Sequence, residues 1–339
     1  MPKVSLILAV RNGMPYLPEA IKSLLAQTFS DFELILIDDA STDGSLDYLQ
    51  SLSDPRIRLQ RNQRQKGLAA SLNIGLDLAQ GEYIARMDAD DISLPRRLER
   101  QVAYLQTHPE LSICGSWART FGEGKEQLWR YPEQDAQIKA EMIFASVLVH
   151  SSVMMRASHV KEHIVRYDES QPAAQDYALW AELQDRVKFA NLPQVLLRYR
   201  LHPQQMGGRK GGLQQQVADR VREEQLARFG FSVSEEDRTL HHRVARWDFA
   251  NGLEALPAIE GWLLRLFEAN MSSAFLDSDA LGRTLERRWW AACRAQSRQG
   301  LQAWTMYKDS KIAAFGRRSA LDRGLFAAKS LASSLGLRR

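Results

Sequence analysis

The sequence has little cysteine and no long hydrophobic run, and both absences narrow what the protein can be. Its two cysteines, Cys114 and Cys293, lie far apart and form no Cys-x-x-Cys or Cys/His pattern. We therefore expect neither a disulfide framework nor a structural zinc site, and a reducing compartment fits. The first apolar run ends at Arg11, and no later stretch reaches the roughly 20 apolar residues of a membrane-spanning helix. These features predict a cytoplasmic protein.

A strong net charge is also missing. The 339 residues carry a formal net charge of +4, which is too small to indicate a nucleic-acid partner. The Gly-x-x-x-x-Gly-Lys-Ser/Thr motif does not occur, which excludes a P-loop nucleotide hydrolase. Hydrophobic residues (45%) and charged residues (25%) are present in ordinary shares, and the length fits a globular chain of two domains.

The N-terminal third alternates between short apolar runs and amphipathic stretches. Strands are expected at residues 4–10, 33–38, 57–60 and 82–87, and helices at 15–27, 45–52, 67–78 and 95–106. Strand–helix repeats form crossover units with parallel strands, so we predict an α/β domain with a Rossmann-like, mostly parallel sheet. Ligands bind at the edge of such sheets where the strands end.

The pattern changes twice further along the chain. Short strands and one helix are expected between residues 111 and 202, followed by a glycine-rich break at 204–213. After this break no proline occurs beyond Pro257, apolar residues recur every three or four positions, and five of the eight tryptophans are found. We therefore predict two domains, an α/β domain at residues 1–205 and an all-helical appendage at 213–339.

Three carboxylates are crowded in one turn directly after an expected strand: Asp88, Asp90 and Asp91. Like charges this close repel each other, so something must hold them together. Two convergent carboxylates suit Mg²⁺ or Mn²⁺, hard cations that prefer oxygen ligands and often bridge to a phosphate. The alternative is a solvated turn in which one Asp caps the following helix.

A second acidic turn, DDASTDG, follows the strand expected at residues 33–38. An Asp at the end of a strand can accept a hydrogen bond from the base or ribose of a nucleotide. Ser41, Thr42 and Asp43 are equally suited to capping the next helix, and capping is the simpler interpretation of this turn taken alone.

Six stretches together resemble the inverting family 2 glycosyltransferases, which have the GT-A fold. They are VSLILAVRNG, PYLPEAIKSLLAQTFSDFELILIDDASTDGS, GLAASLNIGLDLAQGEYIARMDADDISLPRRLERQ, HSSVMMR, QDYALW and LLRYRLHPQQM. Their order and spacing are specific, and they extend over roughly residues 3–205. The resemblance implies a GT-A domain that uses Mn²⁺ or Mg²⁺ to move a sugar from a nucleotide-diphosphate donor to an acceptor hydroxyl, with inversion.

The resemblance also implies roles for single residues. Asp39 would bind the base, Asp88 the ribose or diphosphate, and the nucleotide would contact four residues in all: Ala9, Arg11, Asp39 and Asp88. Asp90 would hold the metal ion, and Asp176 in QDYALW would be the catalytic base. Three more residues are expected in the same cleft, in reach of phosphate or acceptor: Asp91, His150 and His202. For the two histidines, a structural role with satisfied hydrogen bonds is the simpler interpretation.

Two positions depart from the family pattern. Many relatives carry a tyrosine in the first loop where this chain has Arg11, whose guanidinium could stack on the base instead. Gln175 stands where relatives often have a second acid, which leaves Asp176 as the candidate base. The resemblance favours a UDP-sugar as donor and a glycan or lipid-linked acceptor, in surface polysaccharide or glycolipid biosynthesis.

Two other functions share some of these features. A sugar-1-phosphate nucleotidyltransferase would have the same sheet and metal, but it should carry a glycine-rich basic loop after the first strand. AVRNGMPYL has one glycine and one arginine, which disfavours that function. A non-catalytic relative that only binds the sugar nucleotide would have the same motifs.

The C-terminal end is basic and amphipathic. Residues 311–339 contain seven Lys or Arg against one acid, Asp322. One apolar stripe is expected on a helix, formed by Leu321, Leu325, Ala328, Ala332 and Leu335. Peripheral contact with the anionic inner face of a membrane is one interpretation. Packing of the stripe against other helices of the appendage is the simpler one.

Overall fold

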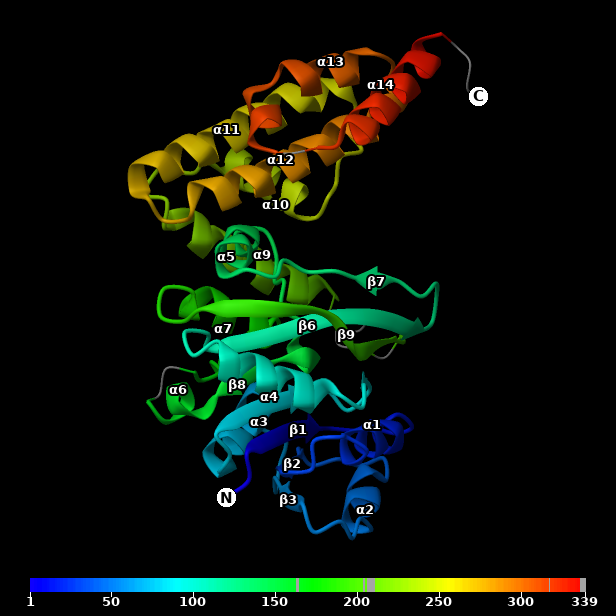
Figure 1. The fold of residues 1–339 in the computed structure, drawn as a ribbon, viewed down its shortest axis with the longest axis vertical. Coiled ribbons are helices and arrows are strands. Elements are labelled where there is room, and N and C mark those ends of the chain that lie inside the picture. Colours follow the sequence, from blue (N-terminus) through cyan, green and yellow to red (C-terminus); the bar gives the residue numbers. More distant parts are fainter. Residues whose placement is uncertain (163–164, 204, 206–210, 317, 336–339) are drawn as a thin grey trace. The chain divides into compact units, whose positions relative to one another are not determined.

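The computed structural model describes residues 1–162, 165–203, 205, 211–316 and 318–335 (Figure 1). The chain divides into two compact units. The sheet unit holds Met1–Ile138 and Ser146–Ala218, and the helical unit holds Lys139–Ala145 and Asp219–Arg339. None of the described helices is long and apolar enough to cross a membrane.

The sheet unit contains a mixed sheet whose described strands follow the order β3-β2-β1-β4-β8-β6-β9-β5, with β7 paired to β6. Its first four strands are β1 (Val4–Val10), β2 (Phe32–Asp38), β3 (Ile57–Arg61) and β4 (Tyr83–Met87). These four pair in parallel. Every residue of β1 and β2 is buried, which explains why these runs are almost continuously apolar rather than alternating.

The later strands add antiparallel pairing. They are β5 (Ile92–Ser93), β6 (Ile113–Gly122), β7 (Leu128–Trp129), β8 (Met154–Arg156) and β9 (Phe189–Leu201). β8 runs antiparallel to β4 and β6, and β5 runs antiparallel to β9, whereas β6 and β9 are parallel. The predicted parallel arrangement therefore holds for the N-terminal strands and gives way to a mixed one beyond them.

Helices connect the first four strands as predicted, whereas two further helices and a 3₁₀ turn lie among the described residues between 111 and 174, where none was expected. In chain order, the helices and the turn are α1 (Leu17–Leu25), α2 (Ser45–Gln50), α3 (Leu68–Leu78), α4 (Arg97–Thr107), α5 (Asp135–Met142), the 3₁₀ turn η1 (His150–Ser152), α6 (Ala157–Lys161) and α7 (Gln175–Leu183). α1 shows why: Leu17, Ala20, Ile21 and Leu24 recur at helical spacing and are all buried on one face. Each strand and helix expected before residue 107 is present, with ends within two residues of the predicted ones.

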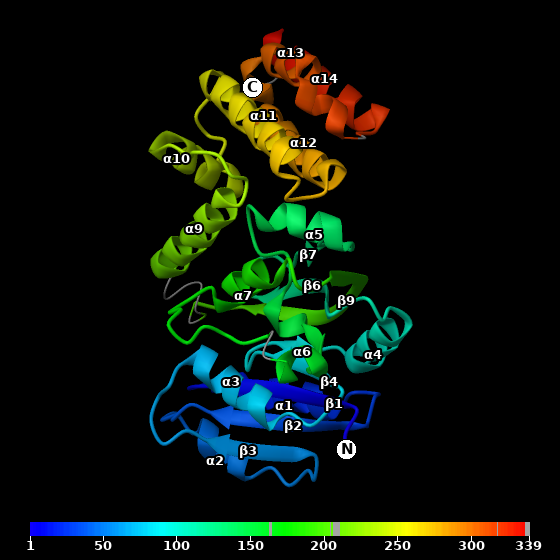
Figure 2. The ribbon, with the colours of Figure 1, turned by 90° about the vertical axis from the view of Figure 1, so that its left-hand side faces the viewer.

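The helical unit confirms the predicted helical character of the C-terminal part (Figure 2). Its helices are α9 (Gly211–Ala227), which begins in the sheet unit, α10 (Glu235–Ala245), α11 (Leu256–Ser273), α12 (Ser278–Ala295), α13 (Gln302–Asp309) and α14 (Ala320–Ser334). Three 3₁₀ turns lie between them: η2 (Leu253–Ala255), η3 (Ser297–Gln299) and η4 (Lys311–Phe315). Trp262 and Trp289 are fully buried in their core.

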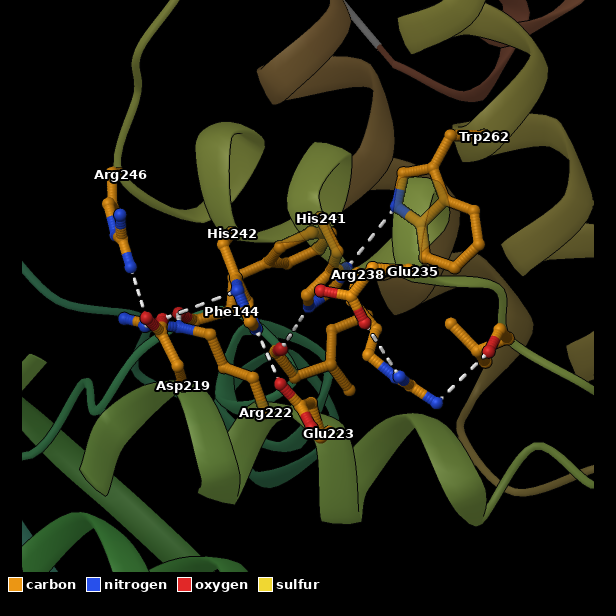
Figure 3. Close-up of polar contacts among 12 residues, drawn as sticks. Phe144, Asp219, Arg222, Glu223, Glu235, Arg238, His241, His242, Arg246 and Trp262 are labelled. Atoms are coloured by element: carbon orange, nitrogen blue, oxygen red, sulfur yellow. Dashed lines mark hydrogen bonds and ion pairs between the residues drawn. The ribbon is translucent and has the colours of Figure 1, made fainter. Parts of the chain in front are cut away.

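A short segment from within the first half of the sequence, 139–145, belongs to the helical unit. Ile143 and Phe144 are part of its hydrophobic core. Arg222 donates from Nε to the Phe144 carbonyl at 2.6 Å, and His241 lies 2.8 Å from the Ile143 carbonyl through Nε2 (Figure 3). The buried carboxylate of Glu141 pairs with Arg287 at 2.6 Å.

Candidate functional site

The loops after β1 and β2 are fastened to each other by hydrogen bonds. The backbone N–H of Asn12 donates to Ser41 Oγ at 3.0 Å, and that of Gly13 donates to Ser45 Oγ at 2.9 Å. The hydroxyl of Ser41 in the DDASTDG turn and the hydroxyl of Ser45, which directly follows this turn, thus fix the first loop. Arg11 in that loop is exposed, whereas Ala9 near the end of β1 is buried.

Asp39 is buried at the carboxyl end of β2, where its backbone N–H donates to the Val10 carbonyl at 2.8 Å. Its carboxylate accepts three hydrogen bonds: from Asn62 Nδ2 at 2.8 Å, from the Lys66 N–H at 2.7 Å and from the Gly67 N–H at 2.9 Å. Asp39 therefore organises the chain that leads into α3. Its predicted contact with the nucleotide base stays a prediction.

Asp88, just beyond β4, is held by a buried arginine. Both terminal nitrogens of Arg86 donate to the two carboxylate oxygens of Asp88, one of them at 2.6 Å. Ser151 Oγ donates to the same carboxylate at 2.6 Å. Such a two-pronged arginine–carboxylate pair fixes the orientation of the carboxylate as well as its charge.

Asp90 and Asp91 are held from β9. His202 Nε2 lies 3.0 Å from Asp90 Oδ2. Arg200 binds the same turn twice, because its N–H donates to Asp91 Oδ1 at 2.8 Å and its Nε donates to the Asp90 carbonyl at 2.7 Å. The ring of Tyr16 lies against both the His202 imidazole and the Arg200 guanidinium, with separations of 4.6 Å in each case.

The three carboxylates of this turn fit a divalent cation. One oxygen each of Asp88, Asp90 and Asp91 lies within 4.8 Å of the others. Burial and the neighbouring carboxylates raise the pKa of Asp90 and raise the pKa of Asp91 further. Asp91 is fully buried, and its Oδ2 has no hydrogen-bond partner among the described residues. A bound cation stabilises a buried carboxylate whose oxygen has no hydrogen-bond partner.

Asp176 lies in the first turn of α7 but is not its N-cap residue. The N-cap residue is Ala174, without a side-chain hydrogen bond. The Asp176 carboxylate accepts hydrogen bonds from backbone N–H groups within this first turn, those of Tyr177 and of Asp176 itself. Burial raises the pKa of Asp176, and the charge of Asp88 acts in the same direction. The Arg86 guanidinium acts in the opposite direction. Asp176 and the carboxylate turn therefore interact electrostatically.

His150 is hydrogen-bonded in the way expected of a structural histidine. Its Nε2 lies 2.7 Å from the Tyr167 hydroxyl. Burial, together with the charge of Arg86, holds the pKa of His150 well below its usual value, so the ring is neutral. Tyr167 is itself fixed to α3, because its N–H donates to Asn73 Oδ1 at 3.0 Å.

Three non-glycine residues in the loops after β1, after β2 and before α7 have left-handed backbone conformations. Asn12, Ala40 and Ala174 have φ values of 54°, 56° and 49°. Each conformation is costly for a residue other than glycine and persists where the surrounding structure enforces it. One lies in the loop after β1, one directly follows Asp39, and one directly precedes α7. Backbone strain at all three loops is typical of a functional site.

Sequence reasoning missed three residues of this site: Arg86, Ser151 and Arg200. All three residues lie within the stretches that carry the family resemblance, Arg200 in the last of them, LLRYRLHPQQM. A signal for Arg86 was present, because an arginine inside an expected buried strand needs an acidic partner. Nothing local pairs Ser151 or Arg200 with the acidic turn.

Comparison with known proteins identifies the family. A family model described as "Glycosyl transferase family 2" matches residues 5–164. An uncharacterised glycosyltransferase of Haemophilus influenzae is 33% identical over 237 residues, which are 66% of this chain and 73% of that protein. The chain belongs to glycosyltransferase family 2. The predicted family, the GT-A type fold and the glycosyltransferase class are thereby confirmed.

Two further proteins are similar to this chain. The Escherichia coli protein named UDP-Glc:alpha-D-GlcNAc-diphosphoundecaprenol beta-1,3-glucosyltransferase WfaP is 28% identical over 204 residues, 60% of this chain and 78% of that protein. The crystal structure of Staphylococcus aureus TarS 1-349 with UDP-GlcNAc is 16% identical, with a TM-score of 0.56 over 87% of this chain and 88% of that one. The TarS likeness shows the fold of this glycosyltransferase.

Proposed function

We propose that this family 2 glycosyltransferase is a metal-dependent, inverting enzyme that moves a sugar from a nucleotide-diphosphate donor to an acceptor hydroxyl. One observation carries the proposal. A turn of three clustered carboxylates with the geometry to hold a cation interacts electrostatically with a further carboxylate, Asp176, whose pKa is raised. Inverting transfer needs these two functions, a binding place for the charged leaving group and one base.

Asp90 is the proposed metal ligand, and the chain offers further ligands beside it. The Asp91 Oδ2 without a partner and the His202 nitrogen beside Asp90 are donors that Mn²⁺ or Mg²⁺ accepts. A bound cation would supply the positive charge that neutralises the departing nucleotide diphosphate. Arg86 keeps the Asp88 carboxylate in one orientation, ready to contact ribose or diphosphate.

The nucleotide itself is proposed to lie over the ends of β1 and β2. Asp39 is the residue proposed to accept a hydrogen bond from the base there, with Ala9 and the exposed side chain of Arg11 as further proposed contacts. A planar guanidinium can stack on a base in place of the tyrosine that many relatives carry.

Asp176 is the proposed general base. The acceptor oxygen attacks the anomeric carbon, the bond from that carbon to the diphosphate oxygen breaks, and the hydroxyl proton passes to the Asp176 carboxylate. A single displacement from the face opposite to the leaving group inverts the anomeric centre. The raised pKa makes this carboxylate a stronger base than an exposed aspartate, whose pKa is about 3.9.

The names of relatives support a choice of donor and acceptor. WfaP is named for UDP-glucose and a diphosphoundecaprenol-linked sugar, and TarS binds UDP-GlcNAc. For this chain we propose a UDP-sugar donor and a glycan or lipid-linked acceptor, in polysaccharide or glycolipid biosynthesis. A lipid-linked acceptor would bring the enzyme to the cytoplasmic face of a membrane.

Thermal unfolding with a panel of nucleotide diphosphates, each with Mn²⁺, Mg²⁺ or chelator, tests the proposal. A uridine diphosphate present at a hundred times its Kd should add about 2.7 kcal/mol of stability, and the gain should disappear with chelator. Release of the nucleoside diphosphate from a UDP-sugar panel then separates an enzyme from a non-catalytic binder. Stabilisation without any turnover would favour the non-catalytic alternative, and release of inorganic diphosphate from a separate mixture of UTP and a sugar 1-phosphate would indicate a nucleotidyltransferase.

A further inference from the structure

The last helix, α14, exposes an apolar face. Leu321, Leu325 and Leu335 have exposed fractions of 71%, 61% and 62%. At 3.6 residues per turn, the face spans an arc of about 120° that contains no charged residue. It consists of Leu321, Leu325, Ala328, Leu331, Ala332 and Leu335. This face includes the stripe predicted from the sequence, and it does not pack against the helical unit.

The opposite side of α14 explains why the apolar face points outward. Phe326 and Ser330 are the buried residues of the helix. The Phe326 ring makes edge contacts with Trp290 at 5.2 Å and with Trp304 at 5.5 Å between centroids. One aromatic anchor therefore fixes α14 on the unit, and the broader apolar face is left without a covering element among the described residues.

A groove with basic and aromatic walls adjoins this helix. It has a volume of about 350 Å³ and lies between α13, η4 and α14, with Trp304, Tyr307, Lys308 and Arg323 among its lining residues. Lysine and arginine beside aromatic rings are typical of surfaces that contact lipid headgroups. The groove thus brings cationic side chains next to the exposed leucines.

The charge of this part of the chain matches an anionic partner. Residues 302–335 contain six Lys or Arg against two acids, Asp309 and Asp322. Two of these cations have acidic partners: Lys308 lies 3.4 Å from Asp309, and Arg318 lies 3.0 Å from Glu286. Lys329 lies on α14 itself, between the apolar face and the buried one. Arg323 is about 160° from Leu325 around the helix, so its positive charge lies outside the apolar face. This charge would attract this part of the helical unit as a whole toward a negatively charged surface.

We infer that the apolar face of α14 and the adjoining basic groove dock the protein on the surface of an anionic phospholipid bilayer. The leucines insert at the level of the acyl-chain boundary, and Lys308 and Arg323 add to the electrostatic attraction by the anionic surface. This inference does not depend on the proposed transfer reaction. It gives the enzyme a place at the membrane whatever its donor or acceptor.

Vesicle sedimentation of the full chain tests this inference. We expect binding to vesicles with about one third phosphatidylglycerol, weaker binding to phosphatidylcholine alone, and a fall with rising salt. Leu325→Gln should weaken binding to the anionic vesicles about tenfold, because a leucine inserted in lipid is replaced by a polar side chain. Met271→Gln is the matched control, because Met271 is equally exposed (62%) on α11 and lies outside the face; it should bind as the wild type does.

The basic groove has its own test. Lys308→Glu with Arg323→Glu should reduce binding to anionic vesicles about tenfold or more and leave binding to neutral vesicles unchanged. The control, Arg186→Glu with Lys188→Glu, makes the same change in net charge at two exposed positions of the sheet unit. Equal losses in both pairs would overturn the proposed groove contact.

Two further outcomes would overturn the inference as a whole. One is the lack of binding to any vesicle at low salt. The other is a dimer in analytical ultracentrifugation that Leu321→Gln with Leu325→Gln dissociates, without vesicle binding by the wild type. That result would assign the apolar face to a second copy of the chain. Thermal unfolding of each variant confirms that it is folded.

Discussion

Arg86 connects the two acidic parts of the site, and its removal should change both. It is buried, it holds Asp88 with two hydrogen bonds, and its charge lowers the pKa of Asp176. Arg86→Met should therefore raise the pKa of Asp176 further and release Asp88. We expect a fall in transfer rate of about tenfold or more, with the acid limb of the rate–pH profile displaced to higher pH.

The pH profile separates this positioning role from a purely structural one. A folded Arg86→Met variant with a lower rate but an unchanged acid limb would show that Arg86 does not act on the base. Arg96→Met is the matched control, because Arg96 is exposed and pairs with Glu99 on the surface of α4. It should keep both the rate and the profile.

Asp176→Asn tests the general base. Asparagine has nearly the same shape and cannot accept the proton, so the transfer rate should fall by about 10²–10⁴-fold while donor affinity stays nearly unchanged. Glu182→Gln, an exposed change on the same helix, should leave both quantities as they are. A folded Asp176→Asn variant that retains more than about a tenth of the wild-type rate would refute the assignment.

Asp90→Asn tests the metal. The variant keeps the volume of the side chain but loses the charge that a divalent cation needs, so Mn²⁺ or Mg²⁺ should no longer strengthen binding of the nucleoside diphosphate. Calorimetric titration with and without chelator measures this. Wild-type binding that is equal in chelator would contradict the metal assignment, and a variant that still responds to Mn²⁺ would move the ligand role to Asp91 or His202.

The sequence predicted the acidic residues of the site better than the residues that hold them. Asp88, Asp90 and Asp91 stand together in one turn, so their proximity follows from the chain itself. Their partners Ser151 and Arg200 come from segments more than 60 and 100 positions away along the chain. Such contacts depend on how β4, β8 and β9 are placed in the sheet, which no local pattern contains.

At the scale of single elements, α10 contains a histidine whose titration should control the stability of the helical unit. His241 is fully buried, and burial lowers its pKa to about 3. Trp262 Nε1 donates to its Nδ1 at 3.3 Å, and its Nε2 lies 2.8 Å from the Ile143 carbonyl. These two bonds require the neutral ring protonated on Nε2, so a second proton would remove the acceptor that Trp262 needs.

The sign of the pH dependence follows from this depressed pKa. The unfolded chain takes up a proton near the ordinary histidine pKa of about 6.5, whereas the folded chain does not until about pH 3. Stability is therefore complete well above pH 6.5 and is lost as the pH falls, by about 1.4 kcal/mol between pH 7.5 and 5.5. Urea unfolding at the two pH values measures this loss.

His241→Gln is the control for this prediction, because an amide can keep one donor and one acceptor without titrating. The wild type should lose more stability than the variant on acidification. Equal losses in the two proteins would assign the effect to other groups, such as His242, which contacts Asp219 and Glu223.

Elements with a strong local pattern were predicted closely, and elements defined by their partners were not. In α1 the helical spacing of the apolar residues indicates which face is buried, and in β2 the nearly continuous apolar run indicates burial on both faces. The stripe on α14 was also visible, but its direction was not, because the side that is buried carries Phe326 and Ser330 and not the leucines. Periodicity shows that a face is apolar and does not show what covers it.

For the whole molecule, the main difference from the sequence-based expectation is segment 139–145. A boundary near residue 205 assigns this segment to the α/β domain, whereas it belongs to the helical unit. The fully buried Phe144 ring stacks on His241 at 4.7 Å, and the Arg288 guanidinium lies 3.8 Å from its centroid. The helical unit therefore cannot be removed by one cut without exposing apolar side chains of this segment.

This arrangement predicts opposite effects of one double substitution in two contexts. In the full chain, Ile143→Ser with Phe144→Ser should destabilise the helical unit by several kcal/mol, about 3–5 from the phenylalanine alone, because it leaves a cavity in a packed core. In a fragment that ends at residue 212, the same side chains have lost α10, α11 and α12, and exposed apolar groups promote association. There the double substitution should reduce dye binding and aggregation.

Two measurements test whether segment 139–145 belongs to the helical core. They are unfolding of the full chain and light scattering of the fragment, each with and without the two substitutions. The control is Leu128→Ser, which replaces an already exposed leucine of the sheet unit and should have little effect in either context. If the substitutions left the full chain as stable as the wild type, segment 139–145 would not be part of the helical core. If the fragment stayed monomeric without the two substitutions, the α/β part would tolerate the exposed Phe144. The boundary near residue 205 predicted from the sequence would then be an adequate place to divide the chain.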